Sequence, residues 1–334
     1  MIQLDFSKEI KIQELPQQEE WQKNIVAFLE EWYSDSEIVI TKTSGSTGIP
    51  KNIELTKSAM IQSATLTGKF LNLKEGDTAL LCMPSLYIAG KMMLVRAIVW
   101  KLNLFCIQPV SHPLQNISRE FTFSAMTPMQ VENSLDKISA VKKLIVGGAQ
   151  ISSHLLNLLK NKPTDIYESF GMTETISHIA LKKVSGNADH PVFHTLPDTR
   201  IRLDERGCLC IQPSFLQEEI ITNDIVSIIS DHEFEWLGRI DNVINSGGIK
   251  IFPEKVEKQL RTIIDREFII SSLPDDLLGN KVVLLIAGKT IPELKEKISN
   301  FPFENKYEKP KEIFYIDHFD KTHTGKIVRK KVIS

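Results

Sequence analysis

Helix-like and strand-like segments alternate along the first half of the chain, and this alternation constrains the fold more than any other feature. Apolar residues with helical spacing occupy four segments: 21–32, 57–71, 90–100 and 153–159. Short apolar runs typical of strands occupy six others: 37–41, 52–55, 78–82, 104–107, 143–146 and 165–167. Such alternation predicts an α/β fold with layered sheets.

The second half of the chain changes character. Residues 199–229 read as short strands separated by turn residues, which indicates a small β subdomain. From residue 238, the sequence GRIDNVINSGGIKIFPEKVEKQL predicts a strand, a glycine turn, a strand and a helix. Further strands are predicted at 268–271, 282–286 and 313–316, with a helix at 292–298. We therefore expect a large layered α/β N-terminal domain, residues 1–238, and a small α+β C-terminal domain, residues 239–334.

Charge and cysteine content exclude several classes of protein. Lysine and arginine total 40 against 42 acidic residues, so neither a nucleic-acid-binding stripe nor a polybasic membrane anchor is indicated. The first residues, MIQLDFSKEIKIQEL, lack the apolar core of a signal peptide, and no apolar stretch approaches the roughly 20 residues of a membrane span. The four cysteines, Cys82, Cys106, Cys208 and Cys210, form no zinc pattern and read as buried thiols. We expect a cytoplasmic protein that binds no nucleic acid and inserts in no membrane.

A loop rich in hydroxyls and glycines, TSGSTGIPK, covers residues 43–51. Glycines let several backbone N–H groups converge on an anion, the hydroxyls add short donors, and Lys51 adds a positive charge. The loop therefore suits a triphosphate, although its spacing is neither that of a Walker loop nor GxGxxG. Taken alone, the same residues also fit a flexible surface turn.

Four more motifs follow this loop along the chain: Gly147-Gly148-Ala149-Gln150, SFGMTET at 169–175, Thr222-Asn223-Asp224, and GRIDNVINSGGIKI at 238–251. A terminal Gly325-Lys326-Ile327 with Arg329 completes the set. Their identity and order resemble those of the adenylate-forming superfamily, which includes acyl-CoA synthetases, the adenylation domains of peptide synthetases, and luciferases. The resemblance extends from about residue 38 to the end of the chain.

The resemblance implies a site for ATP and Mg²⁺. It assigns the phosphates to Thr43, Ser44, Gly45, Ser46, Thr47, Gly48 and Lys51. It places adenine along Gly148 and Ala149 and beside Phe170 and Gly171, where Phe170 replaces the family's usual tyrosine. Thr173 is implied at the α-phosphate and Glu174 as a ligand of Mg²⁺, which prefers oxygen ligands. Asp224 is implied at the ribose hydroxyls, with Arg239 at the ribose or phosphate edge.

The C-terminal motifs imply a mobile lid. Asp241 matches the hinge about which the small domain turns, and Gly247 and Gly248 match the turn that lines the pantetheine channel of coenzyme A. Lys326 is implied as the catalytic lysine that bridges carboxylate and phosphate oxygens, which relieves the repulsion between two anions.

Short members of this superfamily resemble the o-succinylbenzoate–CoA ligases of menaquinone biosynthesis. Because such an acid has two carboxylates, its pocket needs an additional cation or donor, and Lys91 and His178 are the candidates for binding it. Each has an ordinary alternative: Lys91 extends its stem over a core helix, and His178 is a hydrogen-bonded loop histidine. Only 42 residues precede the phosphate loop, fewer than in typical relatives, and the sequence does not indicate the oligomeric state.

Three other functions stay open at this point. The protein is then another aryl- or acyl-CoA ligase, a stand-alone enzyme that loads a carrier protein, or an inactive nucleotide-binding regulatory protein. The joint presence of Lys51, Glu174, Asp224, Arg239 and Lys326 disfavours the last of these.

Overall fold

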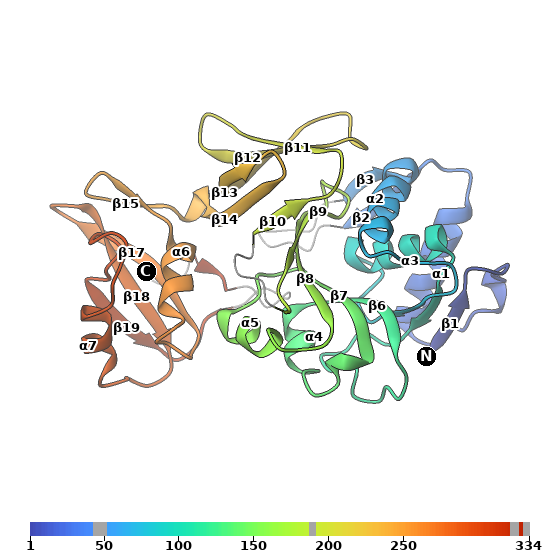
Figure 1. The fold of residues 1–334 in the computed structure, drawn as a ribbon, viewed down its shortest axis with the longest axis horizontal. Coiled ribbons are helices and arrows are strands. Elements are labelled where there is room, and N and C mark those ends of the chain that lie inside the picture. Colours follow the sequence, from blue (N-terminus) through green and yellow to red (C-terminus); the bar gives the residue numbers. More distant parts are fainter. Residues whose placement is uncertain (43–51, 187–191, 321–326, 330–334) are drawn as a thin grey trace. The chain divides into compact units, whose positions relative to one another are not determined.

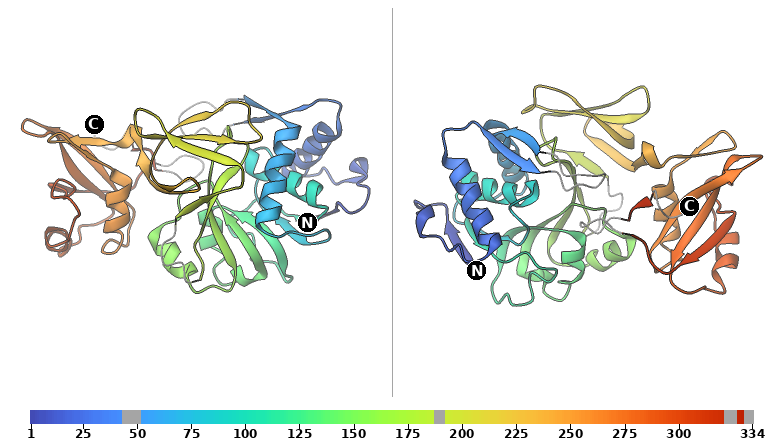
Figure 2. Two further views of the ribbon diagram at one scale, coloured as in Figure 1. Left: turned by 45° about the horizontal axis from the view of Figure 1, so that its top comes forward. Right: turned by 180° about the vertical axis from the view of Figure 1, so that it is seen from behind.

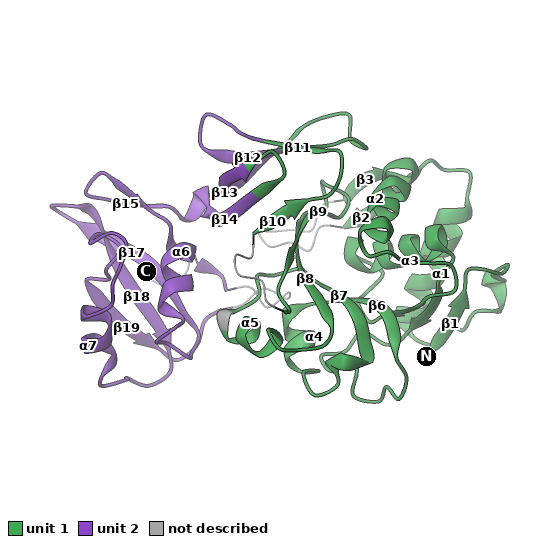
Figure 3. Cartoon of the chain, in the orientation of Figure 1, with its two compact units in different colours: residues 1–201, 211–220, 230–233 green, residues 202–210, 221–229, 234–334 purple. Residues whose placement is uncertain are grey.

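The computed structural model describes residues 1–42, 52–186, 192–320 and 327–329 (Figure 1). The chain divides into two compact units, which Figure 3 colours separately. Unit 1 comprises Met1–Ile201, Ile211–Ile220 and Ser230–Glu233, and unit 2 comprises Arg202–Cys210, Ile221–Ile229 and Phe234–Ser334. Because the units are defined by compactness and interleave in sequence, the predicted domain boundary between residues 238 and 239 stays a prediction.

Unit 1 contains the helices α1 (Glu20–Tyr33), α2 (Lys57–Phe70), α3 (Ile88–Trp100), α4 (Pro128–Glu132) and α5 (Ser153–Leu159). Its strands are β1 (Ile2–Asp5), β2 (Ile38–Lys42), β3 (Asn52–Thr56), β4 (Thr78–Leu81), β5 (Asn103–Cys106), β6 (Phe121–Met126), β7 (Val141–Val146), β8 (Asp165–Gly171), β9 (His178–Lys183) and β10 (Phe193–Thr195). Residues of both units contribute to β11 (Thr199–Leu203), β12 (Cys208–Pro213), β13 (Ile220–Ser230) and β14 (Glu233–Arg239).

The main sheet of unit 1 has the strand order β1-β5-β4-β6-β7-β8-β9-β10. Its centre, from β5 to β8, is parallel, and β1, β9 and β10 join antiparallel. Neighbouring residues of β4 enter different hydrophobic clusters: Leu81 packs with α1, α2 and α3, whereas Leu80 packs with α4 and α5. Burial on both faces is what parallel strands require, and the predicted layered α/β fold is confirmed.

Side-chain caps mark where several of these helices begin. Thr56 accepts a hydrogen bond from the Ala59 amide at α2, and Ser152 accepts one from the Leu155 amide at α5. At α4, Thr127 and Gln130 form a reciprocal capping box. Each cap satisfies an amide that has no partner within its helix. Within the described residues, no helix is long and apolar enough to cross a membrane.

Unit 2 adds β15 (Ile244–Ser246), β16 (Ile249–Ile251), α6 (Pro253–Leu260), β17 (Phe268–Asp275), β18 (Gly279–Ala287), α7 (Leu294–Ser299) and β19 (Glu312–Ile316). Strands β17, β18 and β19 form one sheet, against which α6 and α7 pack through a shared apolar cluster (Figure 2). This is the small α+β unit that the sequence predicts. All four cysteines are free and buried, as expected, and burial raises the pKa of Cys82 to about 12.

A buried ion pair joins the end of the described chain to the core of unit 2. The Arg329 guanidinium donates to both oxygens of Glu257 on α6, at 2.8 and 2.7 Å. Glu257 also accepts from the Ile270 amide of β17 at 2.7 Å. Arg329 Nε lies 4.0 Å from Glu254, which accepts a hydrogen bond from the Asn242 side chain. Burial raises the pKa of Glu257, and the charge of Arg329 opposes that shift.

Replacing Arg329 by methionine is expected to destabilise unit 2, because the buried Glu257 carboxyl group loses its cation partner and two of its hydrogen bonds. Removing one partner of a buried pair costs about 3 kcal/mol, which native-state hydrogen exchange of the β17 and β18 amides measures directly. Lys258→Met on the same helix is the control, since it removes an exposed ion pair with Glu235 whose loss costs less than about 1 kcal/mol. Equal losses of stability in Arg329→Met and Lys258→Met would contradict the stabilising role of the buried ion pair.

Candidate functional site

Eight of the predicted site residues lie outside the described residues: Thr43, Ser44, Gly45, Ser46, Thr47, Gly48, Lys51 and Lys326. The residues that flank the phosphate loop are described. Strands β2 and β3 pair antiparallel, and Lys42 lies opposite Asn52 at the last register position. Both ends of the predicted phosphate loop are therefore held next to each other.

The glycine turn after β7 lies beside the SFGMTET motif. Strand β7 pairs with β8 so that Val146 lies opposite Glu168, and the Ser169 hydroxyl donates to the Val146 carbonyl at 3.0 Å. A Cβ atom on Gly147 would lie 2.4 Å from Ser169 Oγ, and Gly148 has a φ of +84°. Glycine is thus favoured at both positions, by close approach to the Ser169 hydroxyl at the first and by left-handed backbone at the second.

Phe170 lies near the end of β8 and is half-buried. Its ring meets the ring of Phe193 edge-on, with 5.6 Å between the centroids. The pairing of β8 with β9 shifts register between Phe170 and Gly171. The predicted adenine residues Gly148, Ala149, Phe170 and Gly171 are thereby brought to the ends of two neighbouring strands.

A tight turn presents Thr173 and Glu174. The Thr175 hydroxyl, fully buried, accepts from the Met172 amide at 2.9 Å and lies 2.8 Å from the Ser177 carbonyl. Glu174 is exposed, and its carboxylate makes no hydrogen bond or ion pair with the described residues. Carboxylate oxygen suits Mg²⁺, which commonly takes one or two protein carboxylates and completes its shell with phosphate and water. No group of three or more metal-binding side chains occurs in the part of the chain that is described.

The predicted ribose residues meet within unit 2. Asp224 is 6% exposed, and its Oδ1 accepts from the Trp236 indole N–H at 2.9 Å and lies 3.8 Å from the Arg239 guanidinium. Arg239 also lies 3.6 Å from Asp241, which accepts a hydrogen bond from the side-chain amide of Asn223 at 3.3 Å. Two motifs separated in sequence thus share one polar cluster, in which a carboxylate is available beside a cation.

The predicted hinge and channel residues follow directly. Asp241 belongs to a short 3₁₀ turn, Ile240–Asn242, between β14 and β15. Gly247 and Gly248 form the two-residue turn between β15 and β16, with φ of +58° and +79°. Positive φ at both positions is typical of a type I′ hairpin turn, for which glycine is favoured.

Lys91 has a different partner from the one predicted. Its ammonium lies 3.1 Å from Glu31 on α1 and 5.0 Å from the centroid of the Phe28 ring. The side chain is 9% exposed, so this pair joins α3 to α1 in a largely buried position. A substrate carboxylate at Lys91 would therefore have to displace Glu31, and the substrate role of Lys91 stays a prediction.

His178 lies in a buried polar cluster that also contains a residue the sequence analysis missed, Arg96. His178 Nε2 lies 3.2 Å from the Thr67 hydroxyl, and the Arg96 guanidinium donates to Ser177 Oγ at 2.6 Å. Burial, together with the charge of Arg96, lowers the pKa of His178 well below its usual value of 6.5. The histidine is therefore neutral at pH 7.

Arg96 is a buried cation that has no carboxylate partner in the described part of the chain. It is 3% exposed, its Nε has no hydrogen-bond acceptor, and it forms no ion pair with the described residues. Burial lowers its pKa to about 9, which leaves it protonated at neutral pH. In the sequence, Arg96 interrupts the otherwise apolar run MMLVRAIVW, and that interruption is the feature that identifies it.

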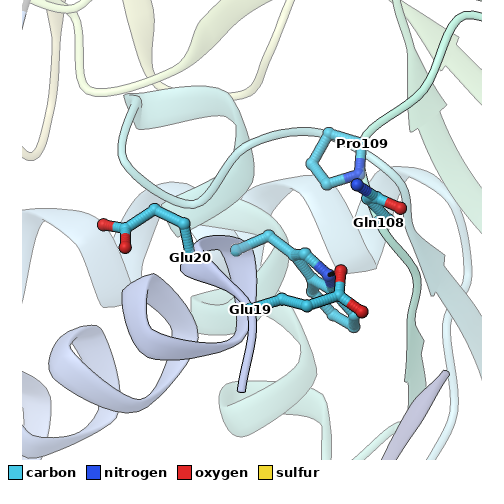
Figure 4. A pocket seen from close by; sticks show the side chains of 5 residues that line it. Glu19, Glu20, Gln108 and Pro109 are labelled. Atoms are coloured by element: carbon cyan, nitrogen blue, oxygen red, sulfur yellow. Dashed lines mark hydrogen bonds between the residues drawn. The ribbon is translucent and has the colours of Figure 1, made fainter. Parts of the chain in front are cut away.

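A separate shallow pocket is lined by Glu19, Glu20, Trp21, Gln108 and Pro109 (Figure 4). It contains none of the predicted site residues. The carboxylates of Glu19 and Glu20 line this pocket and would repel an anion, so the pocket does not suit the predicted carboxylic acid substrate.

Comparison with known proteins decides the family. Residues 1–212 match the family model described as AMP-binding enzyme. The chain belongs to this family. A solved AMP-binding enzyme from Dyadobacter fermentans, described as an acyl-CoA synthetase (AMP-forming)/AMP-acid ligase II-like protein, is 36% identical. The similarity covers 93% of both chains with a TM-score of 0.65.

Two further relatives are more distant. The 2-succinylbenzoate–CoA ligase of Listeria monocytogenes is 27% identical over 92% of this chain and 72% of its own length. The o-succinylbenzoate coenzyme A synthetase of Bacillus subtilis, solved with ATP and magnesium, shares the fold of this AMP-binding enzyme with a TM-score of 0.74. It is 21% identical, over 88% of this chain and 69% of that one.

The buried, neutral His178 makes the stability of this AMP-binding enzyme depend on pH. Its pKa in the folded state lies below the unfolded value of 6.5, so the unfolded state takes up a proton first as the pH falls. We expect the free energy of unfolding to decrease below pH 6.5, by as much as about 2 kcal/mol at pH 5. Urea titrations of His178→Gln should lack this component, whereas His232→Gln, at an exposed histidine, should keep it. An identical pH dependence of His178→Gln and the wild type contradicts the prediction.

Proposed function

We propose that the protein is an ATP-dependent acid–CoA ligase whose acid is o-succinylbenzoate. The observation that carries this proposal is the contact between Arg96 and Ser177. It ties a buried cation, which has no carboxylate partner among the described residues, to the segment that begins with Thr173 and Glu174. A site for a negatively charged group thus lies four residues along the chain from the predicted α-phosphate contact.

In the first step, a carboxylate oxygen of the acid attacks the α-phosphorus of ATP. An acyl-adenylate, which is a mixed carboxylic–phosphoric anhydride, forms, and pyrophosphate leaves. Both reactants are anions, so the protein must bring like charges together and neutralise them. Lys51 and Lys326 supply positive charge in this proposal, Thr173 donates to the α-phosphate, and Asp224 accepts from the ribose hydroxyls. Mg²⁺, held by Glu174 when bound, neutralises phosphate charge.

In the second step, the thiol of coenzyme A loses its proton and attacks the acyl carbonyl. A thioester forms and AMP leaves. We assign the hinge to Asp241 and the pantetheine channel to Gly247 and Gly248. The left-handed turn at these glycines leaves the backbone without side chains, which suits the close approach of a narrow ligand.

The second carboxylate of the acid binds Arg96 in this proposal. A guanidinium presents parallel N–H donors that fit a carboxylate, and a carboxylate satisfies the charge and the free Nε of a buried arginine. Neutral His178 beside it adds a donor or an acceptor without adding charge. The keto-diacid o-succinylbenzoate has the required second carboxylate, and the ligase relatives named above carry that substrate in their names.

Two other functions differ from the proposed one in specific steps. An enzyme that loads a carrier protein would form the same acyl-adenylate and would differ only in the thiol that accepts the acyl group. A regulatory protein that binds nucleotide without catalysis would not need Glu174 or Lys326 for its function. We also propose that the protein works in the cytoplasm on free small molecules, with no nucleic-acid partner.

A panel of acids tests the proposal. With o-succinylbenzoate we expect pyrophosphate exchange, and we expect thioester formation when coenzyme A is the acceptor. Thioester formation on a phosphopantetheinyl carrier protein in place of coenzyme A would contradict the assignment of the acceptor. Arg96→Met should raise the KM for o-succinylbenzoate about 10- to 100-fold, the worth of hydrogen bonds to a charged group. The KM for a monoacid such as benzoate should stay within about threefold. Lys91→Met is the matched variant from the same helix. If Lys91→Met, and not Arg96→Met, raised the KM for o-succinylbenzoate more than the KM for benzoate, the second carboxylate would have to be assigned to Lys91.

Lys326→Ala tests the proposed chemistry. Adenylation is expected to fall by at least about 100-fold, the usual cost of removing a group that stabilises transition-state charge. Thioester formation from preformed acyl-adenylate should survive, because that step begins after pyrophosphate has left. Lys330→Ala in the same tail is the control. Full adenylation activity in Lys326→Ala contradicts the assignment.

A further inference from the structure

A second buried ion pair lies under the predicted adenine residues, and no step of the proposed reaction uses it. Lys182 on β9 lies directly opposite Glu168 on β8, with 2.5 Å between Nζ and Oε2. Their side chains are 15% and 4% exposed. The neighbouring pair on the same two strands, Lys183 and Asp165, has 48% of each side chain exposed. An exposed pair is ordinary, whereas a buried one must offset the loss of hydration.

The other oxygen of Glu168 holds the glycine turn. Its Oε1 accepts from the Ile151 amide at 3.0 Å, immediately after the turn 147–150. The next residue of β8, Ser169, donates to the Val146 carbonyl immediately before that turn. Two consecutive side chains of β8 thus fix both ends of the turn along which adenine is predicted to lie.

Lys182 extends the same network toward Phe170. Its ammonium lies 4.7 Å from the centroid of the Phe193 ring, within the range of a cation–π contact. The Phe193 ring in turn meets Phe170 edge-on. The ion pair therefore contacts both walls of the predicted adenine site: the glycine turn through Glu168, and the aromatic residue through Lys182 and Phe193.

We infer that Glu168 is a positioning residue of the nucleotide site and that Lys182 offsets its buried charge. This inference rests on the proposed ATP-dependent activity. Glu168 acts as the acceptor that keeps Ile151, and with it the turn 147–150, in place. Lys182 offsets the charge of this acceptor. An apolar pair at these two positions would fill the same space, but it would leave the Ile151 amide without its partner.

Two double variants separate positioning from stability. Glu168→Leu/Lys182→Met removes both charges and the acceptor, so that no unpaired charge is buried. Glu168→Gln/Lys182→Met removes both charges but keeps an amide oxygen for the Ile151 N–H. Isothermal titration calorimetry with AMP, well below the unfolding temperature, is expected to give at least a tenfold weaker Kd for the first variant. The second should lie within threefold of the wild type.

The exposed pair supplies the control. Asp165→Asn/Lys183→Met changes the same two strands and should bind AMP like the wild type. Equal AMP affinity of the leucine and glutamine variants overturns the positioning role while leaving the proposed function intact, because the wild type still binds AMP. A wild type that binds neither AMP nor ATP overturns both. Should the leucine variant fail to fold, Glu168→Met/Lys182→Met carries the same expectation.

Discussion

The parallel strands at the centre of unit 1 must be buried on both faces, and most of the architecture follows from that requirement. Hydrophobic clusters fill both sides of β4, where α1 to α3 pack on one side and α4 and α5 on the other. Because both faces of such a sheet are covered, mainly the ends of its strands are accessible to water. The polar groups predicted to handle ATP lie there, in the turn after β7 and at the end of β8.

The helices were the most predictable part of the fold, and the strands that carry polar residues were the least. Strand β6 was missed because Ser124 interrupts its apolar run; the hydroxyl is buried but donates to the Leu80 carbonyl at 2.9 Å. Strand β8 was expected to end at Tyr167, yet it continues through Glu168, whose charge is offset by Lys182 on the neighbouring strand. Partners far apart in sequence make these polar residues compatible with a strand, and no local pattern reveals such partners.

The same limit applies to the candidate site. The resemblance to the adenylate-forming superfamily identified Thr173, Glu174 and Asp224 and supplied their roles. It could not show that Lys91 is paired with Glu31 while Arg96, about one and a half turns along the same helix, has no carboxylate partner among the residues that the structure describes. Which of two buried cations is free depends on what the rest of the fold places beside each, so the choice of acid contact required the structure.

The contacts of Glu254 have a mechanical consequence. This helix residue accepts a hydrogen bond from Asn242, next to the predicted hinge, and approaches Arg329, which is also clamped to Glu257. A rotation about the proposed hinge at Asp241 would therefore carry α6 and residues 327–329 together, because the contacts of Glu254 and Glu257 join them.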